Sequence, residues 1–234
     1  MIVAAHPDDE TIGASALCGP PHETIVVHAT DGAPRDPRWW PAGISDRDAY
    51  ATERAREASR ALALVGAERI ALGFADQEAA LAMPQLASAI AAQIARRAPD
   101  LIITHAYEGG HPDHDAVAFA VAQARPLVRS PMEVYEMALY HGAPGTLVVG
   151  ELIDNTASLR HALPPAQLRR RRAMLACFAS QRATLAPFVS LAHERYRRAP
   201  AYDFSRPPHD GPLLYERMGF PISGAGWRAL ATRR

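Results

Sequence analysis

The sequence predicts an α/β fold with a Rossmann-like, mostly parallel sheet and helices on both faces. Short runs rich in β-branched residues alternate with longer alanine-rich segments, the pattern of βαβ units. The longer segments carry apolar residues three and four positions apart, as amphipathic helices do. With 234 residues, 48% of them hydrophobic, the chain is long enough for one well-buried core. We therefore expect one domain over residues 1–234, with residues 186–234 as a loop-rich extension packed on it.

The expected elements follow the chain in a regular order. Strands are expected at residues 1–5, 23–29, 69–74, 100–104, 132–140 and 146–153. Helices are expected at 46–67, 83–99 and 164–184. The first two helices end at the breakers Gly66 and Pro99. The connection 30–45 is a long proline-rich loop that carries Trp39 and Trp40, and it either walls a ligand site, with the indoles stacking on a sugar, or packs on the protein.

Composition excludes several classes of function. The chain has 25 basic and 25 acidic residues, so no net field attracts nucleic acid or an anionic membrane. All basic residues are arginine, which excludes a Schiff-base lysine and a Walker phosphate loop. Cys18 and Cys177 are expected as free thiols in a reducing compartment. Neither a membrane span nor a signal peptide is indicated, so we expect a cytoplasmic protein that binds neither membrane nor nucleic acid.

Two motifs of the same form follow the first and the fourth expected strands. The first strand leads into HPDD at residues 6–9, and the fourth leads through a glycine pair into HPDH at residues 111–114. Proline is favoured at the first helical position, and an acid beside it suits the positive end of the helix dipole, so each motif predicts a strand-to-helix turn. In an open parallel sheet such turns share the carboxyl edge, where ligand crevices form. We therefore expect the two motifs to build one site.

The residue types in these motifs indicate a metal ion. Three acids, Asp8, Asp9 and Glu10, stand in a row, and their mutual repulsion requires a positive partner. The first and fourth residues of each motif lie about one helical turn apart and can face a common point. These candidate ligands are His6, Asp9, His111 and His114. Two histidines and a carboxylate with one position left for water are typical of catalytic zinc, so we expect one Zn²⁺ per chain. Taken alone, HPDD also fits an ordinary capped helix.

The motifs resemble those of a known family. "AHPDDE" near the start, "TDG" after the second strand and "GGHPDHDA" after the fourth look like the PIG-L/LmbE family of zinc-dependent N-deacetylases. These motifs span roughly the first half of the chain. Fainter agreement lies in Arg54, Glu57 and the pair 180–181, Ser-Gln, after an arginine-rich helix. The resemblance implies an LmbE-like fold.

The resemblance also implies roles for single residues. The metal ligands would be His6, Asp9 and His114. The remaining assignments are Asp8 as general base, His111 as the histidine that stabilises the oxyanion or protonates the leaving amine, Asp113 as the acid that orients it, and Arg54 as a substrate contact. Some members carry a tyrosine two residues before this histidine, where this chain has Gly109. Either Tyr107 replaces it from the same loop, or the role is absent.

The chemistry expected from these residues is amide hydrolysis. Asp8 lies beside a ligand yet is free of the metal, so it can accept a proton from water. A protonated His111, bonded to Asp113 through its other ring nitrogen, would stabilise charge on the acyl oxygen. We expect removal of the N-acetyl group from an N-acetylglucosamine-type amino sugar or glycoconjugate. The alternatives are a zinc amidase for a larger acyl amide or thiol conjugate, and a non-catalytic metal-binding Rossmann-like protein. A homo-oligomer is left open.

Two further residues stand at strand ends. His105 ends the strand before HPDH, and it is either a core histidine or part of the site. Asp31 follows the second strand, where a turn-stabilising role and a role at the site are both open. The other histidines are scattered without ligand spacing, so we expect them in the core or on the surface.

Overall fold

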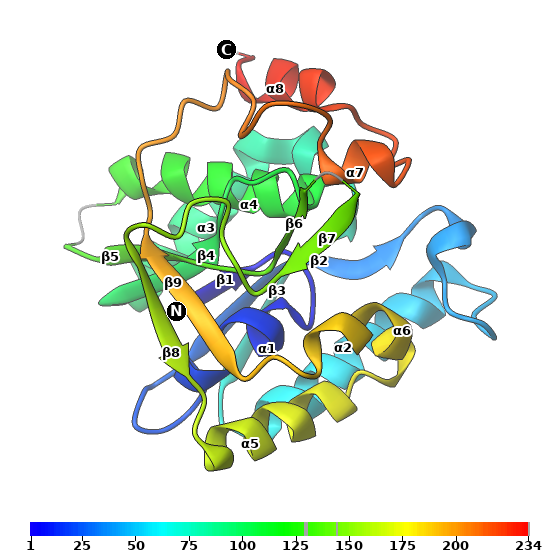
Figure 1. The fold of residues 1–234 in the computed structure, drawn as a ribbon, viewed down its shortest axis with the longest axis vertical. Helices are drawn as coiled ribbons and strands as arrows, with labels where there is room; N and C mark the ends of the chain where they lie inside the picture. The colour runs from blue at the N-terminus through cyan, green and yellow to red at the C-terminus, as the bar shows by residue number, and fades with distance from the viewer. Residues whose placement is uncertain (129–130, 144, 234) are drawn as a thin grey trace.

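The computed structural model describes residues 1–128, 131–143 and 145–233 (Figure 1). A seven-stranded sheet with the order β3-β2-β1-β4-β5-β9-β8 forms its centre. Its strands are β1 (Ile2–Ala4), β2 (Ile25–Pro34), β3 (Glu68–Asp76), β4 (Leu101–His105), β5 (Glu133–Met137), β8 (Ser158–Ala162) and β9 (His193–Arg198). The first five are parallel, whereas β9 runs antiparallel to both β5 and β8. A separate antiparallel pair consists of β6 (Tyr140–Ala143) and β7 (Thr146–Val149).

Helices cover both faces of the central sheet, as expected. They are α1 (Asp9–Gly13), α2 (Arg47–Ala63), α3 (Met83–Arg97), α4 (Pro112–Ala124), α5 (Pro165–Ala176), α6 (Arg182–Leu185), α7 (Leu214–Arg217) and α8 (Gly224–Ala231). Helices α3, α4 and α8 lie on one side of the sheet, and α1, α2 and α5 lie on the other (Figure 1). The result is a three-layer mostly parallel α/β fold.

Strand β1 shows how the sequence produces these layers. Val3 packs into the core beneath α3 and α4, whereas its neighbours Ile2 and Ala4 pack into the core beneath α2 and α5. Successive side chains of a strand point to opposite faces, so a strand covered on both sides must be apolar at every position. The uninterrupted apolar start of the chain therefore becomes a central strand.

Helix α3 shows the complementary pattern. Leu86, Ile90 and Ile94 follow one another at intervals of four and are fully buried against the sheet. This spacing places them on one stripe of the helix. The helix ends at Ala98, which has the left-handed conformation (φ 44°), directly before Pro99. Proline disfavours the helical conformation of the residue before it, so the helix stops here as the sequence predicts.

The first four expected strands are confirmed as β1 to β4, but the second half of the chain differs. Residues 132–140 supply β5 and then the start of β6, and residues 146–153 contribute β7 outside the central sheet. The helix expected at 164–184 breaks after α5, and a 3₁₀ turn precedes α6.

Two strands of the seven-stranded sheet, β8 and β9, were not expected from the sequence, and β9 lies within residues 186–234. Its sequence, HERYRR, is mostly charged, so no apolar alternation marks it. Glu194 and Tyr196 are buried and bond to each other, and β5 and β8 pair with β9 on either side. Tertiary pairing therefore overrides the polar composition. The C-terminal region supplies a strand of the sheet in addition to loops packed on it.

The strand order creates one crevice at the carboxyl edge. From β1 the chain continues to β2 on one side, whereas β4 lies on the other side and continues away to β5. The connections that leave β1 and β4 therefore diverge, and such a switch point is where open α/β sheets bind ligands. Both HPD motifs leave the sheet at this point.

The structure also bears on two expectations from the sequence, the free cysteines and the absence of a membrane span. Cys18 and Cys177 are both free thiols, as expected. Among the described residues, no helix combines the length and the apolar character that crossing a membrane requires.

The α3 stripe gives a stability prediction. We expect Leu86→Ala to lower the free energy of unfolding by about 2 to 5 kcal/mol, because it leaves a cavity between the helix and the sheet. The matched control is Leu81→Ala, whose side chain is 66% exposed and should change stability by no more than about 0.5 kcal/mol. Urea denaturation followed by circular dichroism measures both. Equal effects of the two variants would contradict this account of the core.

Candidate metal centre and active site

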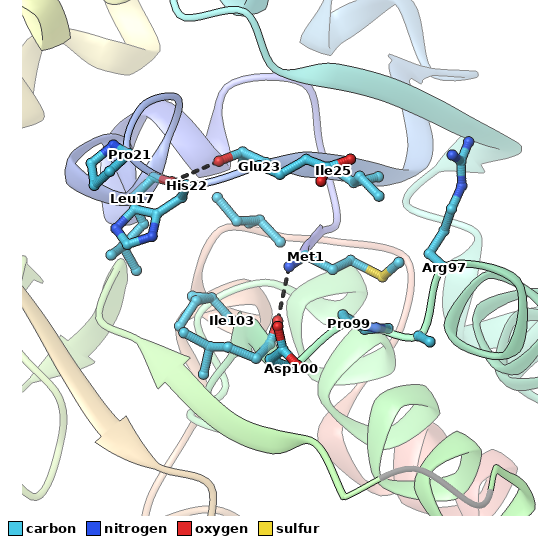
Figure 2. A pocket seen from close by; sticks show the side chains of 14 residues that line it. Met1, Leu17, Pro21, His22, Glu23, Ile25, Arg97, Pro99, Asp100 and Ile103 are labelled. Atoms are coloured by element: carbon cyan, nitrogen blue, oxygen red, sulfur yellow. Dashed lines mark hydrogen bonds between the residues drawn. The ribbon is translucent and has the colours of Figure 1, made fainter.

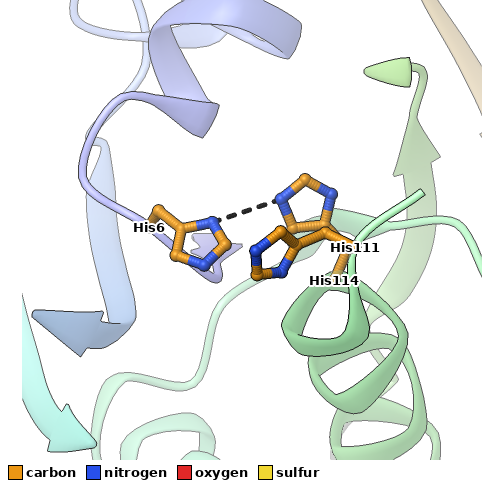
Figure 3. Close-up of side chains that lie close together, drawn as sticks. All are labelled: His6, His111 and His114. Carbon is orange, nitrogen blue, oxygen red and sulfur yellow. Dashed lines mark hydrogen bonds between the residues drawn. The ribbon is translucent and has the colours of Figure 1, made fainter. Parts of the chain in front are cut away.

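The crevice brings together the two motifs that are more than 100 residues apart. His6 follows β1, and His111 and His114 belong to the turn that opens α4; Figure 3 shows the three imidazoles facing one another. His6 Nδ1 lies 3.3 Å from His114 Nε2 and 3.3 Å from Asp9 Oδ2. His114 Nε2 lies 3.3 Å from Asp9 Oδ1. Two imidazole nitrogens and one carboxylate, which meets the two nitrogens with different oxygens, therefore lie about 3.3 Å from one another; we call this group the donor triangle.

This triangle has the size that a tetrahedral metal site requires. With metal–ligand bonds of about 2.0 to 2.1 Å, two ligands of a tetrahedral ion lie about 3.3 Å apart. The donors are two imidazole nitrogens and one carboxylate, and all three side chains are buried. His6, Asp9 and His114 could thus hold a tetrahedral ion, and the neighbouring cavity would leave room for water as a fourth ligand.

The remaining nitrogen of His6 is held by two carboxylates. His6 Nε2 lies 3.1 Å from Asp76 Oδ1 and 3.3 Å from Asp113 Oδ2. Such contacts place the proton on Nε2 and leave the Nδ1 lone pair for a metal. Burial opposes a charge on this ring, yet the nearby carboxylates of Asp76 and Asp9 raise the pKa of His6 well above its usual value. The local field therefore favours a positive charge at this point.

The structure corrects the role expected for Asp113. Its carboxylate accepts hydrogen bonds from the backbone N–H groups of Gln77 (2.6 Å) and Ala79 (3.1 Å), and it faces His6. It makes no hydrogen bond with His111. His111 Nδ1 instead accepts the backbone N–H of Asp113 at 3.1 Å, because His111 caps helix α4. The expectation that the Asp113 carboxylate orients His111 is therefore wrong.

His111 is a neutral hydrogen-bond donor in this arrangement. Since its Nδ1 accepts a backbone bond, the proton lies on Nε2, which is 4.0 Å from Asp76 Oδ1 at the cavity wall. Burial and the neighbouring His6 and His114 hold the pKa of His111 well below its usual value. The protonated His111 expected from the sequence is not what this environment favours. A nitrogen that carries a proton is also no metal ligand.

Asp8 lies next to the donor triangle without joining it. It caps α1 with φ 130°, a backbone conformation that residues with a side chain rarely adopt. Its Oδ2 accepts a hydrogen bond from Arg54 Nη2 at 2.9 Å. Burial raises the pKa of Asp8 to about 7, and the positive charge of Arg54 opposes this rise. Asp8 is thus a buried carboxylate whose surroundings favour its protonated form more than those of an exposed aspartate do.

Arg54 holds the turn that carries Asp8. Its Nη2 also donates to the Pro7 carbonyl (2.6 Å), and its Nε donates to the Gly32 carbonyl (3.2 Å). A Cβ on Gly32 would lie 2.8 Å from Arg54 Nε, and Gly32 has φ +67°, so only glycine fits here. The guanidinium lines the cavity, but these donors are directed to the protein and not to open space.

A second pair of residues noted in the sequence supports Arg54. Glu57 Oε2 lies 3.6 Å from Arg54 Nη1. Both oxygens of Glu57 accept hydrogen bonds from Ser180, from its backbone N–H at 2.7 Å and its hydroxyl at 2.6 Å. The turn after α5 is thereby connected, through two buried charges, to Asp8.

The three consecutive acids each meet a different partner. Asp9 joins the metal triangle, Asp8 pairs with Arg54, and Glu10 Oε2 lies 2.9 Å from His28 Nε2. From the sequence, one cation was expected to neutralise all three. The structure divides them instead among the candidate metal site, an arginine and a histidine.

His105 and Asp76 complete the surroundings of the triangle. His105 Nε2 accepts the backbone N–H of Ala5 at 2.8 Å, so its lone pair is occupied. Its ring stacks on that of His114, with the ring centroids 4.1 Å apart, and so supports this candidate ligand. Asp76, which the sequence analysis missed, ends β3 at the same carboxyl edge. Like His6, it stands where a parallel strand ends, which is the signal in the sequence that could have identified it.

A cavity of about 200 Å³ opens beside the metal triangle. It is lined by His6, Asp8, Asp9, Ile12, Gly32, Pro34, Trp39, Tyr50, Arg54, Asp76, Gln77, His111, Tyr140, Gln181, Thr184, Leu185, Phe188, Met218 and Phe220. The Phe220 ring lies 4.8 Å from Trp39 and meets His111 edge-on, also at 4.8 Å. Trp40 is structural, because its indole donates to the Pro34 carbonyl. Sequence reasoning missed Phe220, Met218 and Tyr140, since no motif marks the elements that carry them.

Tyr107 and Asp31 have structural partners. Tyr107 packs among Tyr202, Phe204 and Trp227, and its hydroxyl donates to the Arg206 carbonyl, so it does not line the cavity. Gly109 has φ +67°, and a Cβ there would lie 2.7 Å from Leu213. That position therefore holds no side chain. Asp31 Oδ1 accepts the Ala33 N–H at 3.0 Å, the geometry of an Asx turn.

A larger cavity of about 450 Å³ lies at the amino ends of β1, β2 and β4 (Figure 2). Two of its charged groups already have protein partners: the Met1 ammonium donates to the Leu101 carbonyl at 2.8 Å, and Arg97 pairs with Glu68. None of the proposed metal donors lines it, so size alone does not identify the functional site.

The support that Asp113 gives to His6 can be measured as metal affinity. We expect Asp113→Asn to weaken zinc binding by about 10- to 100-fold, because an amide NH₂ in place of one oxygen faces the His6 N–H. His114→Ala should remove stoichiometric binding. The control is Asp210→Asn at an exposed position. Competition with a chromogenic chelator reports all three, and wild-type affinity in Asp113→Asn would contradict the assignment.

Several solved structures share the fold. The A40926 pseudoaglycone deacetylase Dbv21 is 20% identical with a TM-score of 0.63, over 86% of this chain and 98% of that one. The N,N'-diacetylchitobiose deacetylase from Pyrococcus horikoshii is 18% identical with a TM-score of 0.53, over 85% and 82%. The 4-carboxy-2-hydroxymuconate hydratase GalB from Pseudomonas putida is 14% identical with a TM-score of 0.59, over 86% and 96%. At these identities the similarity establishes the fold.

The family follows from the sequence match. Comparison with curated protein sequences finds no match. The family model PIG-L, described as GlcNAc-PI de-N-acetylase, matches residues 1–125, which is more than half of the chain and includes both HPD motifs. The protein therefore belongs to the PIG-L family.

Proposed function

We propose that this protein is a metal-dependent hydrolase that removes the acetyl group from an N-acetylated amino sugar or its glycoconjugate. The observation that carries this proposal is the pairing of an open donor triangle with a buried carboxylate, Asp8, whose pKa burial raises to about 7. A hydrolase for amides needs an activated water and a base that works near neutral pH. Membership of the PIG-L family supports the same reaction class.

We assign the metal as one Zn²⁺ per chain, held by His6, Asp9 and His114. Two imidazoles, one carboxylate and an open fourth position form the donor set that catalytic zinc prefers. When bound, this ion supplies an acidified water and polarises the acyl oxygen. The carboxylates of Asp76 and Asp113 keep the His6 lone pair directed at the ion.

Asp8 is the proposed general base. It is adjacent in sequence to the ligand Asp9, yet its own carboxylate pairs with Arg54 and so remains outside the donor triangle. It lies at the cavity wall, on a backbone with φ 130°. After accepting the proton of the attacking water, Asp8 can pass it to the departing nitrogen, because the same group serves as acid once it is protonated. Arg54 positions this base.

His111 is the proposed donor to the acyl oxygen. Its Nδ1 is occupied by the helix cap, so Nε2 presents its N–H to the cavity. A neutral donor already oriented by the backbone stabilises negative charge without reorganising during the reaction. This assignment keeps the oxyanion role that the family resemblance implies, while the backbone N–H of Asp113, and not its carboxylate, orients the ring.

The substrate class rests on the family description and on the cavity. The family model is described by a de-N-acetylase of an N-acetylglucosamine lipid, and one neighbour is a diacetylchitobiose deacetylase. Trp39 and Phe220 add aromatic surfaces on which a sugar ring can lie. The cavity volume of about 200 Å³ favours a short acyl group. A panel of N-acetyl amino sugars, their conjugates and longer N-acyl analogues, scored by amine and acid release with zinc-loaded protein, tests this choice.

The base assignment predicts a separation of metal binding from turnover. We expect Asp8→Asn to retain zinc, because Asp8 is no ligand, but to lose at least about 100-fold in kcat, because the amide cannot accept the proton. Metal analysis together with steady-state kinetics on the best substrate of the panel measures both. Asp210→Asn again serves as the exposed control. Full activity in Asp8→Asn would remove that residue from the mechanism.

The same assignment predicts the pH dependence. The base must be ionised, so kcat/KM should fall as the pH drops through the pKa of Asp8, which burial raises to about 7. A bound cation favours the ionised carboxylate, so the limb should lie at or below pH 7. In Asp8→Asn this acidic limb should disappear from the residual rate. A pH–rate profile of both proteins, with metal content checked at each pH, decides the matter.

A further inference from the structure

Tyr140 occupies the cavity wall beside the metal triangle, and no sequence motif marks it. It begins β6, and it lines the same cavity as Asp8, Asp9 and His111. Its ring lies 5.2 Å from the His114 ring at an angle of 63°, and 5.8 Å from Phe188. Contacts on two sides fix the orientation of the phenol.

The backbone brings Tyr140 to the second metal turn. A Cβ on Gly110 would lie 2.3 Å from the carbonyl oxygen of Tyr140, so the loop before His111 and the start of β6 are packed backbone to backbone. Any other residue at position 110 would push the two segments apart. The glycine therefore brings a tyrosine from β6 next to the residue that we assign as an acyl-oxygen donor.

The hydroxyl of Tyr140 differs from those of four other tyrosines, each of which has a protein partner. Tyr107 donates to a backbone carbonyl, Tyr196 and Tyr202 donate to glutamates, and Tyr50 accepts a bond from Gln181. No hydrogen bond of the described residues includes the Tyr140 hydroxyl. The Tyr140 side chain is half-buried, and a phenol hydroxyl at such a position normally finds a hydrogen-bond partner. One without a protein partner, at the wall of a cavity that contains the reacting centre, is available to a ligand.

We propose that Tyr140 is a further catalytic residue, whose hydroxyl donates a hydrogen bond to the acyl oxygen of the bound amide. This inference rests on the proposed deacetylase function. A phenol with a usual pKa near 10 keeps its proton at neutral pH, so it is a donor when the amide is attacked. His111 and Tyr140 then form a two-donor oxyanion hole, one N–H from α4 and one O–H from β6. Tyr140 only donates this bond and retains its proton throughout.

The test is Tyr140→Phe in the zinc-loaded full chain, with Tyr135→Phe on β5 as matched control. Tyr135 does not line the metal cavity. A single oxyanion donor is worth about 10²- to 10³-fold in turnover, so we expect kcat to fall by that factor while KM and zinc content stay near the wild-type values. A methylphosphonamidate analogue of the substrate mimics the tetrahedral state. Its affinity for Tyr140→Phe should fall by the same factor as kcat, whereas the amine product should bind the variant as tightly as the wild type.

The outcomes separate the possible errors. If the wild type is active and Tyr140→Phe stays within about threefold of it, the role of Tyr140 is refuted and the deacetylase function stands. A parallel loss of product binding or zinc would assign Tyr140 a packing role and also refute the proposal. If the wild type hydrolyses nothing in the panel, the deacetylase function itself fails, and the proposal fails with it. Thermal denaturation of each variant confirms that the compared proteins are folded.

Discussion

The pairing of β1 with β4 is the constraint on which the site depends. The N–H of Ile103 bonds to the Met1 carbonyl, and this parallel contact aligns two strands whose next connections leave in opposite directions. Only at such a point can side chains from both strand ends face one another without an intervening connection. The donor triangle is therefore a direct consequence of sheet topology. A different strand order would leave His6 and His114 in separate crevices.

At the first turn, the three acids Asp8, Asp9 and Glu10 are buried at the carboxyl edge of the sheet, and each has a different partner. Burying three adjacent carboxylates would be strongly unfavourable unless each found a compensating group. Helix α2 supplies Arg54 to Asp8, β2 supplies His28 to Glu10, and the metal site takes Asp9. The environment thereby separates neighbouring, chemically similar acids into a structural acid, a proposed metal ligand and a proposed base. The pKa values of Asp8 and Asp9 are shifted in opposite directions, which reflects the same separation. Burial raises the pKa of Asp8. The pKa of Asp9 is lowered, because the nearby histidines outweigh the effect of its own burial.

The part of the cavity that would meet the substrate has a different origin from the part that would bind the metal. The residues matched by the family model, 1–125, contain the donor triangle, Asp8 and His111. Tyr140, Phe188, Met218 and Phe220 come from later elements and form much of the apolar wall. The fold is also shared with a hydratase, so the fold alone does not select the reaction. The later elements of the chain are therefore where specificity is to be sought.

The amino-acid sequence by itself determined the α/β class, the first four strands and the two turns that carry the candidate metal donors. These features depend on local signals, an apolar strand followed by proline and acids at a helix start, which need no knowledge of distant partners. Only the tertiary structure decided that the Asp113 carboxylate contacts His6 and that Arg54 pairs with Asp8. It also decided that β9 joins the sheet and that Tyr140 lines the cavity. Each of these depends on contacts between residues far apart in the chain, and their geometry exists only once the layers have packed.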